Sequence, residues 1–268
     1  MGEMENLLDK TRAIKDLLLG GGGPDAFEVI VRVLSKQIGA NVYLVGRRGK
    51  ILGYHFLEDS QCEKIEEILN YSERFPESYN RTLLSIMETQ PNLVYSGKKQ
   101  CLFAPEDCPF SDRFVTVIPI YGGGERLGNM LIMRMKSSFT IEELFLAEYG
   151  ALTVGMEVMR IKAERAEMDT RKRASVQIAL STLSFSELKA AEHVFRELGG
   201  REGLIVASRV ADRTGITRSV IVNSLRKLES AGVIKTRSLG MKGTYISIIN
   251  ENLPVELKNW LSRKGMEI

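Results

Sequence analysis

The feature that most constrains the fold is a pair of helical patterns that meet at the short turn TGIT. They lie within residues 206 to 232, VASRVADRTGITRSVIVNSLRKLESAG. Gly215 in the turn can adopt the left-handed backbone conformation, and Thr217 is a residue type that caps a following helix. Apolar Ile216 suits the packing between the two helices. The pattern predicts a helix-turn-helix whose second helix follows Thr217 and ends at Gly232.

The second of these helices has two distinct faces. Its inward face carries the apolar side chains Val220, Ile221, Leu225 and Leu228. By subtraction, the opposite face carries Arg218, Ser219, Val222, Asn223 and Arg226 or Lys227. Guanidinium, amide, hydroxyl and methyl groups in combination suit the base edges and phosphates of a major groove. This face is therefore predicted to bind double-stranded DNA.

The next residues predict a wing. The run VIKTRSLGMKGTYISII gives two strands around GMKG, with Arg237 and Lys242 near the tip, where a wing meets the sugar-phosphate backbone. Residues 208 to 247 include eight Lys and Arg residues against two Asp and Glu residues. The alternative is a protein-interaction domain with a solvated basic face. DNA binding is favoured because turn, cap, polar face and basic wing coincide in one module.

The N-terminal half mixes helical and strand patterns. Helical spacing covers residues 4 to 19 and Asp25 to Gly39, and helices are also expected over roughly 60 to 71 and 76 to 87, before an irregular loop. The strand-like runs NVYLVG and ILGYHF flank RRGK, which predicts a hairpin. A second hairpin joins FVTVIPIY and RLGNMLIMRM, where Pro119 argues for an edge position or a bulge. This order predicts an α+β domain with an antiparallel sheet, the layout of PAS-like and GAF-like sensor domains.

A long helix is predicted to link the two halves. Thr140 and Glu143 have the spacing of a capping box, and helix propensity stays high through IKAERAEMDTRKR. We expect a helix from residue 140 to about 182, with Asp169 and Thr170 as the place where it could break.

A second capping-box pattern, Ser184 with Glu187, opens the C-terminal domain. The predicted domains are a GAF-like ligand-sensing domain at 1–138, a long linker helix at 139–183 and a winged helix-turn-helix at 184–268. Two domains agree with the length of 268 residues.

Composition excludes several other classes of protein. No apolar run approaches the roughly 20 residues that cross a bilayer, and the charged N-terminal segment argues against a secretory signal, so we expect a cytoplasmic protein. Cys62, Cys101 and Cys108 are too few for a disulfide framework, and with His55 and His193 they match no metal-site spacing. No metal is therefore expected. An enzyme such as a nucleotide hydrolase is disfavoured because GGGERLG lacks the GK[ST] of a P-loop and no Ser-His-Asp set is present.

Residues 207 to 246, ASRVADRTGITRSVIVNSLRKLESAGVIKTRSLGMKGTYI, resemble the winged-helix domain of the CodY family of nutrient-responsive repressors. The runs NVYLVGRRGKILGY, VIPIYGGGERLG and LAEYGALTVGMEVMR resemble the N-terminal half of that family, so the resemblance covers nearly the whole chain. It implies a GAF-type domain that binds isoleucine, leucine or valine, GTP as a second effector, and a homodimer on a palindromic operator.

The resemblance also assigns residues to DNA binding. The family positions matching Ala211, Arg218 and Ser219 recognise DNA, and all three carry the family's residue types. With the residues expected from the pattern, the predicted DNA-binding set is Ala211, Thr217, Arg218, Ser219, Asn223, Arg226, Lys227, Arg237 and Lys242.

For the amino-acid effector, the resemblance implies a pocket made by two segments. Its residues are Lys64, Ile65, Ile68, Phe75, Pro76, Tyr79, Leu102, Phe103, Ala104 and Pro105. Lys64 is a departure, because the family has an arginine there for the ligand carboxylate and lysine lacks the bidentate fork. A sensor for another ligand, such as a cyclic nucleotide, is the resulting alternative.

For GTP, the resemblance implies Arg47, Arg48 and Lys50 of the basic turn with Glu157 and Lys162 of the long helix. Phosphates require such cations, and a carboxylate can accept hydrogen bonds from guanine N1 and N2. The competing interpretation is a solvated hairpin turn for RRGK and a surface pair for Glu157 and Lys162.

Overall fold

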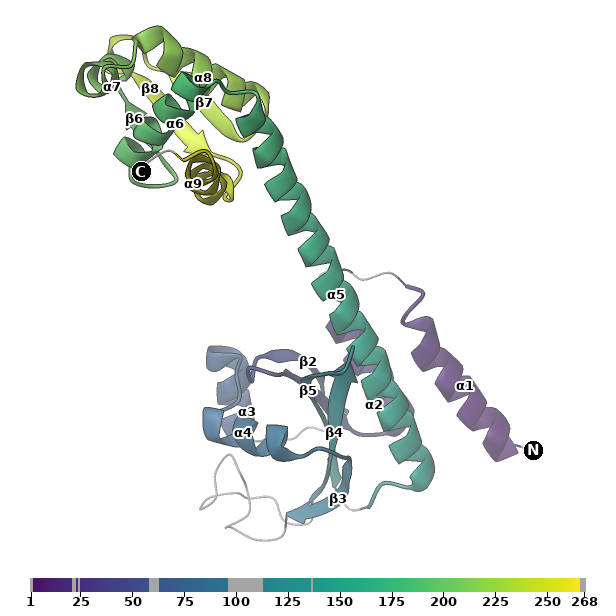
Figure 1. Cartoon of the computed structure of the whole chain (residues 1–268). Coiled ribbons are helices and arrows are strands. Elements are labelled where there is room, and N and C mark those ends of the chain that lie inside the picture. The colour runs from purple at the N-terminus through teal and green to yellow at the C-terminus, as the bar shows by residue number, and fades with distance from the viewer. Residues whose placement is uncertain are drawn as a thin grey trace. The chain divides into compact units, whose positions relative to one another are not determined.

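The computed structural model describes residues 2–20, 23, 25–57, 63–95, 113–135 and 137–265 (Figure 1). The chain divides into two compact units, Met1–Ala163 and Glu164–Ile268. The domain limits expected from the sequence, 1–138, 139–183 and 184–268, stay a prediction.

The first unit contains a five-stranded antiparallel sheet in the order β2-β1-β5-β4-β3. Its strands are β1 (Asn41–Gly46), β2 (Ile51–His55), β3 (Gln90–Tyr95), β4 (Arg113–Gly122) and β5 (Glu125–Met135). Both predicted hairpins, β1 with β2 and β4 with β5, are confirmed. β3 was missed, because Pro91 and the positive φ of 53° at Asn92 interrupt the alternation and shift its register on β4.

Helices cover both faces of this sheet (Figure 1). On one face lie α1 (Gly2–Asp16), α2 (Ala26–Ile38) and the start of α5 (Ile141–Ser181); on the other lie α3 (Glu63–Glu67), a π-helical turn (Ile68–Ser72) and α4 (Glu77–Ser85). β1 is buried on both sides: Val42 and Leu44 face the first layer, and Tyr43 and Val45 face the second. The two layers therefore make two separate apolar cores.

Pro119 lies in an interior strand, but at a position where that strand is paired on one side only. β3 pairs with β4 only as far as Val117, so Pro119 is opposed by Asn129 of β5 alone among the described strand pairings. A register shift follows between Ile120 and Tyr121. The missing N–H of proline therefore breaks no bond to β3.

The predicted capping box at the start of α5 is confirmed. Glu143 N–H donates to Thr140 Oγ1 at 3.3 Å, and Thr140 N–H donates to Glu143 Oε2 at 2.8 Å. The break considered near Asp169 and Thr170 is wrong, because α5 runs unbroken over 41 residues. The Thr170 hydroxyl donates to the Ala166 carbonyl at 2.8 Å, which satisfies it within the helix. No helix in the described ranges is apolar over a length that would cross a bilayer.

The second unit contains a three-stranded sheet in the order β6-β8-β7. Its elements are α6 (Phe185–Leu198), β6 (Glu202–Ile205), α7 (Ala207–Thr214), α8 (Arg218–Ser230), β7 (Ile234–Ser238), a 3-10 turn (Gly240–Lys242), β8 (Thr244–Ile248) and α9 (Leu253–Arg263). The predicted Ser184 and Glu187 capping box is present at α6. β6 was missed, because four residues leading into a helix carry too little alternation to be distinguished from that helix.

Candidate DNA-binding surface and effector sites

The turn between α7 and α8 has the geometry expected from TGIT. Gly215 has φ 71° and its N–H donates to the Ala211 carbonyl at 3.0 Å, which ends α7. Thr217 takes the N-cap position of α8, but its side chain accepts no capping hydrogen bond. The Thr217 hydroxyl instead lies 3.2 Å from the Ser219 hydroxyl, so both groups stay at the exposed end of the helix.

The two predicted faces of α8 are confirmed. Ile221, Leu225 and Leu228 are buried in the core of the second unit, with Val220 partly buried against them. The exposed residues of the opposite face are Arg218, Ser219, Asn223, Arg226 and Lys227. The outward face therefore presents donors and acceptors to solvent, while the apolar face fixes the helix.

Lys227 is already engaged within the unit. Its ammonium group lies 2.7 Å from the Glu187 carboxylate and donates to the Thr182 carbonyl at 3.2 Å. Burial disfavours the charged form of Glu187, but hydrogen bonds from Lys227 and Ser184 outweigh that effect and lower its pKa. Lys227 thus connects α8 to the first turn of α6, a structural contact that the sequence pattern did not reveal.

The wing is held to α8 by Glu229. The carboxylate of Glu229 accepts from the Thr236 N–H at 2.6 Å and from the Thr236 hydroxyl at 2.7 Å. At the base of the wing turn, Gly243 has φ 116°, and a Cβ there would lie 2.5 Å from the Ile205 carbonyl oxygen. The wing turn therefore requires glycine at this position.

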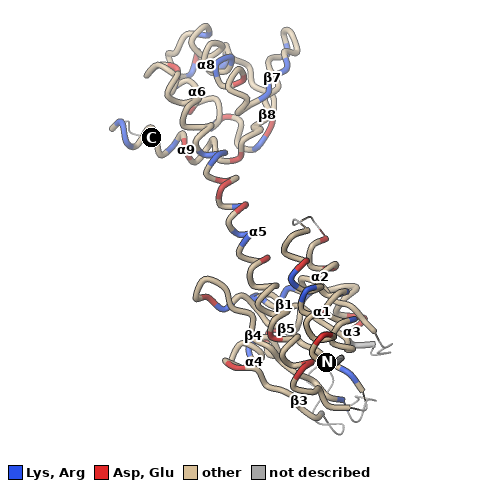
Figure 2. The backbone as a smooth tube through the Cα atoms, turned by 90° about the vertical axis from the view of Figure 1, so that its right-hand side faces the viewer, with Lys and Arg blue, Asp and Glu red and all other residues tan. Residues whose placement is uncertain are grey.

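Basic side chains remain exposed on both elements. Arg218 and Arg226 on α8 and Arg237 and Lys242 on the wing are exposed, and Figure 2 shows Lys and Arg along α8 and β7. Arg213 lies 3.5 Å from Glu197, so part of its charge is compensated. With Glu229 committed to Thr236, the exposed groups of this surface are mainly cationic. Such a surface suits a phosphate backbone.

The described residues that were predicted for the amino-acid pocket lie on the α3 and α4 side of the sheet. Ile65, Phe75 and Tyr79 are buried in one apolar cluster, with Ile68 packed against it. The rings of Phe75 and Tyr79 stack with centroids 5.3 Å apart. Pro76 is exposed at the N-cap of α4.

Other residues of that prediction lie outside what the structure describes. The side chain of Lys64, although α3 includes its backbone, is among them, as are Leu102, Phe103, Ala104 and Pro105. Cys62, Cys101 and Cys108 also lie outside the described residues. Within the ranges that are described, no three His, Cys, Asp or Glu side chains gather as a metal site would require.

The basic turn between β1 and β2 is hydrogen-bonded to the segment that carries Phe75. The Phe75 N–H donates to the Gly49 carbonyl at 2.9 Å, and the Asn80 side-chain amide donates to the Arg47 carbonyl at 3.1 Å. Gly49 has φ 79°, and a Cβ there would lie 3.3 Å from the Phe75 carbonyl oxygen. A turn predicted for GTP is therefore in direct contact with a segment predicted for the amino acid.

Arg47 and Lys162, two residues predicted for GTP, lie near one carboxylate. The Lys162 ammonium is 2.9 Å from Glu125. This hydrogen bond lowers the pKa of Glu125, and the charge of Arg47 adds to the effect. Arg47, Arg48 and Lys50 are exposed. The turn and this part of α5 therefore form a cationic region around Glu125.

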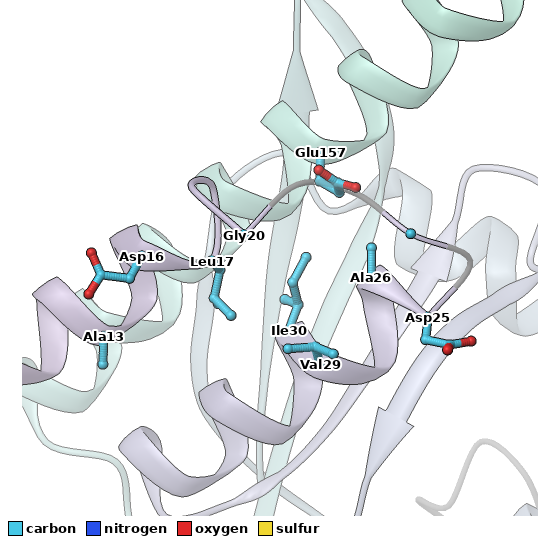
Figure 3. A pocket seen from close by; sticks show the side chains of 10 residues that line it. Ala13, Asp16, Leu17, Gly20, Asp25, Ala26, Val29, Ile30 and Glu157 are labelled. Atoms are coloured by element: carbon cyan, nitrogen blue, oxygen red, sulfur yellow. The ribbon is translucent and has the colours of Figure 1, made fainter.

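Glu157 has a different environment. It is buried and forms two hydrogen bonds with Arg160, at 2.6 and 2.9 Å. It also lines a cavity of about 440 Å³ between α1, α2 and α5, where Leu17, Ala26 and Ile30 provide apolar walls (Figure 3). The interpretation of Glu157 and Lys162 as a surface pair is wrong, because each pairs with a different residue.

Sequence reasoning also missed Arg126, within the GGGERLG run. Its guanidinium donates to the Ile86 carbonyl at 2.7 Å and to the Leu83 carbonyl at 3.2 Å. Both carbonyls lie at the C-terminal end of α4, where the last turn lacks the full set of helical hydrogen bonds. Arg126 therefore fixes the helix that carries Tyr79. No local pattern could indicate this, because the contact spans about forty residues of chain.

Comparison with known proteins decides the family. Residues 6–182 match the model of the CodY GAF-like domain, and residues 201–261 match that of the CodY helix-turn-helix domain. Proteins named global transcriptional regulator CodY are 49% identical over 259 residues in Clostridium kluyveri and 50% identical over 257 residues in Clostridium beijerinckii. Each alignment covers 95% of this chain and 99% of the relative. The chain belongs to the CodY family.

Membership in the CodY family confirms the expected fold, with a GAF domain, a long helix and a helix-turn-helix domain. Its curated relatives are named as transcriptional regulators, which agrees with the expectation that the chain is not an enzyme. Among solved structures, the one described as the cofactor-binding GAF domain of the nutrient sensor CodY from Clostridium difficile is 32% identical, with a TM-score of 0.41. It covers 59% of this chain, and 99% of that structure is matched.

Proposed function

We propose that this CodY-family chain is a cytoplasmic DNA-binding repressor of nutrient-limitation genes, and that branched-chain amino acids and GTP raise its affinity for operators. The observation that carries the proposal is the exposed basic face of α8 beside a basic wing, both fixed from behind by buried contacts. Arg218 and Arg226 would bind base edges or phosphates in the major groove, while Arg237 and Lys242 would bind the backbone.

One feature of the first unit supports a branched-chain amino acid as the effector. The cluster with Ile65, Phe75 and Tyr79 is apolar and lies between a sheet and short helices, which suits an aliphatic side chain. Isoleucine, leucine or valine would place its side chain against this cluster.

GTP as second effector is supported by the cations around Glu125. Arg47, Arg48, Lys50 and Lys162 would bind the phosphates. In the cavity that Glu157 lines, guanine N1 and N2 would donate to Glu157 in place of Arg160. Through the contact between the basic turn and the Phe75 segment, binding at one site would change the ligand affinity of the other.

A homodimer is supported by an exposed apolar stripe on α5. Its side chains are Ile141, Phe145, Leu152, Met156 and Met159. Phe145, Leu152 and Met159 recur every seven residues, the repeat by which helices pair. A second copy of the same stripe is the occupant we propose, because a two-fold dimer offers both copies of α8 to a palindromic operator.

Isothermal titration calorimetry of the full chain with isoleucine, and separately with GTP, tests the effector assignment. Binding of both supports the proposed function. Silence for isoleucine with a thermal shift for a cyclic nucleotide would favour the alternative sensor, which the unusual Lys64 allows. Release of phosphate from GTP by the purified protein would instead indicate a hydrolase.

A further inference from the structure

The hairpin between β4 and β5 contacts helices on both faces of the sheet. Residues 121–126 form the end of β4, the turn and the start of β5. On one side this hairpin touches α5, and on the other it touches the end of α4, the helix that carries Tyr79. α5 continues from the first unit into the second. The hairpin therefore lies between a helix predicted to sense the effector and the helix that leads to the DNA-binding unit.

On the α5 side, the hairpin packs without free space. A Cβ on Gly155 of α5 would overlap the backbone carbonyl oxygen of Tyr121. One turn later, the side chain of Met159 is so close to the hairpin that a Cβ on Gly122 would lie 2.8 Å from Met159 Cγ. Two successive turns of α5 thus rest directly on hairpin backbone.

On the α4 side, the contact is made by hydrogen bonds. Arg126 donates to the carbonyls of Leu83 and Ile86. Its guanidinium carbon lies 5.1 Å from the centroid of the Tyr121 ring, and the Tyr121 hydroxyl donates to the Met87 carbonyl at 3.2 Å. The acceptors are the last turn of α4 and the residues that follow it directly. Arg126 and Tyr121 therefore fix the C-terminal end of α4 to the hairpin.

Tyr121 takes part in both contacts. Its carbonyl oxygen faces Gly155 of α5, and its ring and hydroxyl are held with Arg126 at the end of α4. Close-packed contacts leave no free volume in which a displacement could be absorbed. A shift or a stiffening of α4 would therefore reach α5 through a single residue of the hairpin.

We propose that the hairpin, through Arg126 and Tyr121, transmits binding of the amino-acid effector from α4 to α5. This inference rests on the proposed function, which supplies the ligand and the operator. The effector bound beside Tyr79 fixes α4, the hairpin carries that position to α5, and α5 extends into the second unit. Arg126 is thus a positioning residue, because it holds a helix and not the ligand.

The test measures the factor by which isoleucine raises operator affinity, because this factor defines the coupling between the two sites. Anisotropy of a labelled duplex that the full chain selects from a random pool is recorded at one salt concentration. It is recorded without isoleucine and with isoleucine that calorimetry shows to saturate each variant. We expect a factor on the order of ten for the unmodified protein and about three for Arg126→Met and for Gly155→Ala. A merely structural role would weaken isoleucine binding and leave the factor at saturation unchanged.

Gly150→Ala is the matched control, at another glycine of α5. Alanine is a better helix former than glycine, so neither alanine variant disturbs α5 by itself. A Cβ on Gly150 meets the flexible side chain of Leu34 in α2, whereas a Cβ on Gly155 meets hairpin backbone. Gly150→Ala should keep the full factor.

Two further variants test whether the contacts form one route. If Arg126→Met and Gly155→Ala interrupt the same route, the double variant should keep the factor of about three that passes through the basic turn. Arg126→Lys keeps the charge and offers fewer donors, so its factor should lie between those of the unmodified protein and Arg126→Met. Arg126→Lys also serves as the test if Arg126→Met does not fold.

Each contrary result has a distinct meaning. The full factor in Gly155→Ala or in an Arg126 variant would overturn the inference, as would losses that multiply in the double variant. An unmodified protein whose operator affinity does not respond to isoleucine would overturn the proposed function itself, and that result is visible before any variant is made.

Discussion

Arg218 is the exposed residue with which α8 begins, and its guanidinium has no ion-pair partner among the described residues. We expect Arg218→Ala to lower operator affinity about 10- to 100-fold and to relax preference at one base pair of each half-site. Fluorescence anisotropy with a duplex that the protein selects from a random pool measures this. Arg263→Ala, an exposed arginine at the end of α9, is the control and should bind normally. Equal affinity for both variants would remove Arg218 from the DNA contact.

Glu187 makes the stability of the second unit depend on pH. Its folded-state pKa is lowered, so its ionised form stabilises the fold above the unfolded-state pKa of about 4.3, and this contribution is lost as pH falls through the folded-state pKa. We expect Glu187→Gln to lower the free energy of unfolding at pH 7 by about 1 to 2 kcal/mol, and therefore to unfold at a lower temperature. Between pH 7 and pH 3 the variant should lose less stability than the unmodified protein does. Parallel melting curves against pH for the two proteins would contradict this.

At the scale of elements, the contact between the basic turn and the Phe75 segment can be tested with two matched glycines. Gly49 and Gly124 both have φ 79°, but a Cβ would meet neighbours within 4 Å only at Gly49, where the nearest is the Phe75 carbonyl oxygen. Alanine costs about 1 kcal/mol of backbone strain at either site. Gly49→Ala should in addition weaken isoleucine binding by calorimetry. Equal isoleucine affinity in the two variants would show that the turn does not shape the pocket.

The apolar stripe of α5 carries the dimer prediction. Leu152 lies in the centre of this stripe and is 57% exposed, so Leu152→Glu would place a charge in the proposed interface. We expect sedimentation velocity to show a monomer for Leu152→Glu and a dimer for Val255→Glu, a comparable change at a 61% exposed residue of α9. A dimer in both variants would place the interface elsewhere.

At the scale of the whole molecule, the sequence predicted what local signals specify. Gly215 and the two capping boxes mark helix ends through their own chemistry, so the helix-turn-helix and the start of α5 were found. Contacts between distant segments were not accessible in this way. Lys227 pairs with a carboxylate forty residues earlier, and Arg126 donates to carbonyls of α4 about forty residues earlier.

The central claim is that effector binding and operator binding are coupled. Operator affinity should therefore be measured by anisotropy at one fixed salt concentration, with and without saturating isoleucine, because salt alone changes affinity for DNA. We predict that isoleucine raises the affinity on the order of tenfold, and that operator DNA raises isoleucine affinity by the same factor. Operator affinity that is unchanged by bound isoleucine would contradict the account.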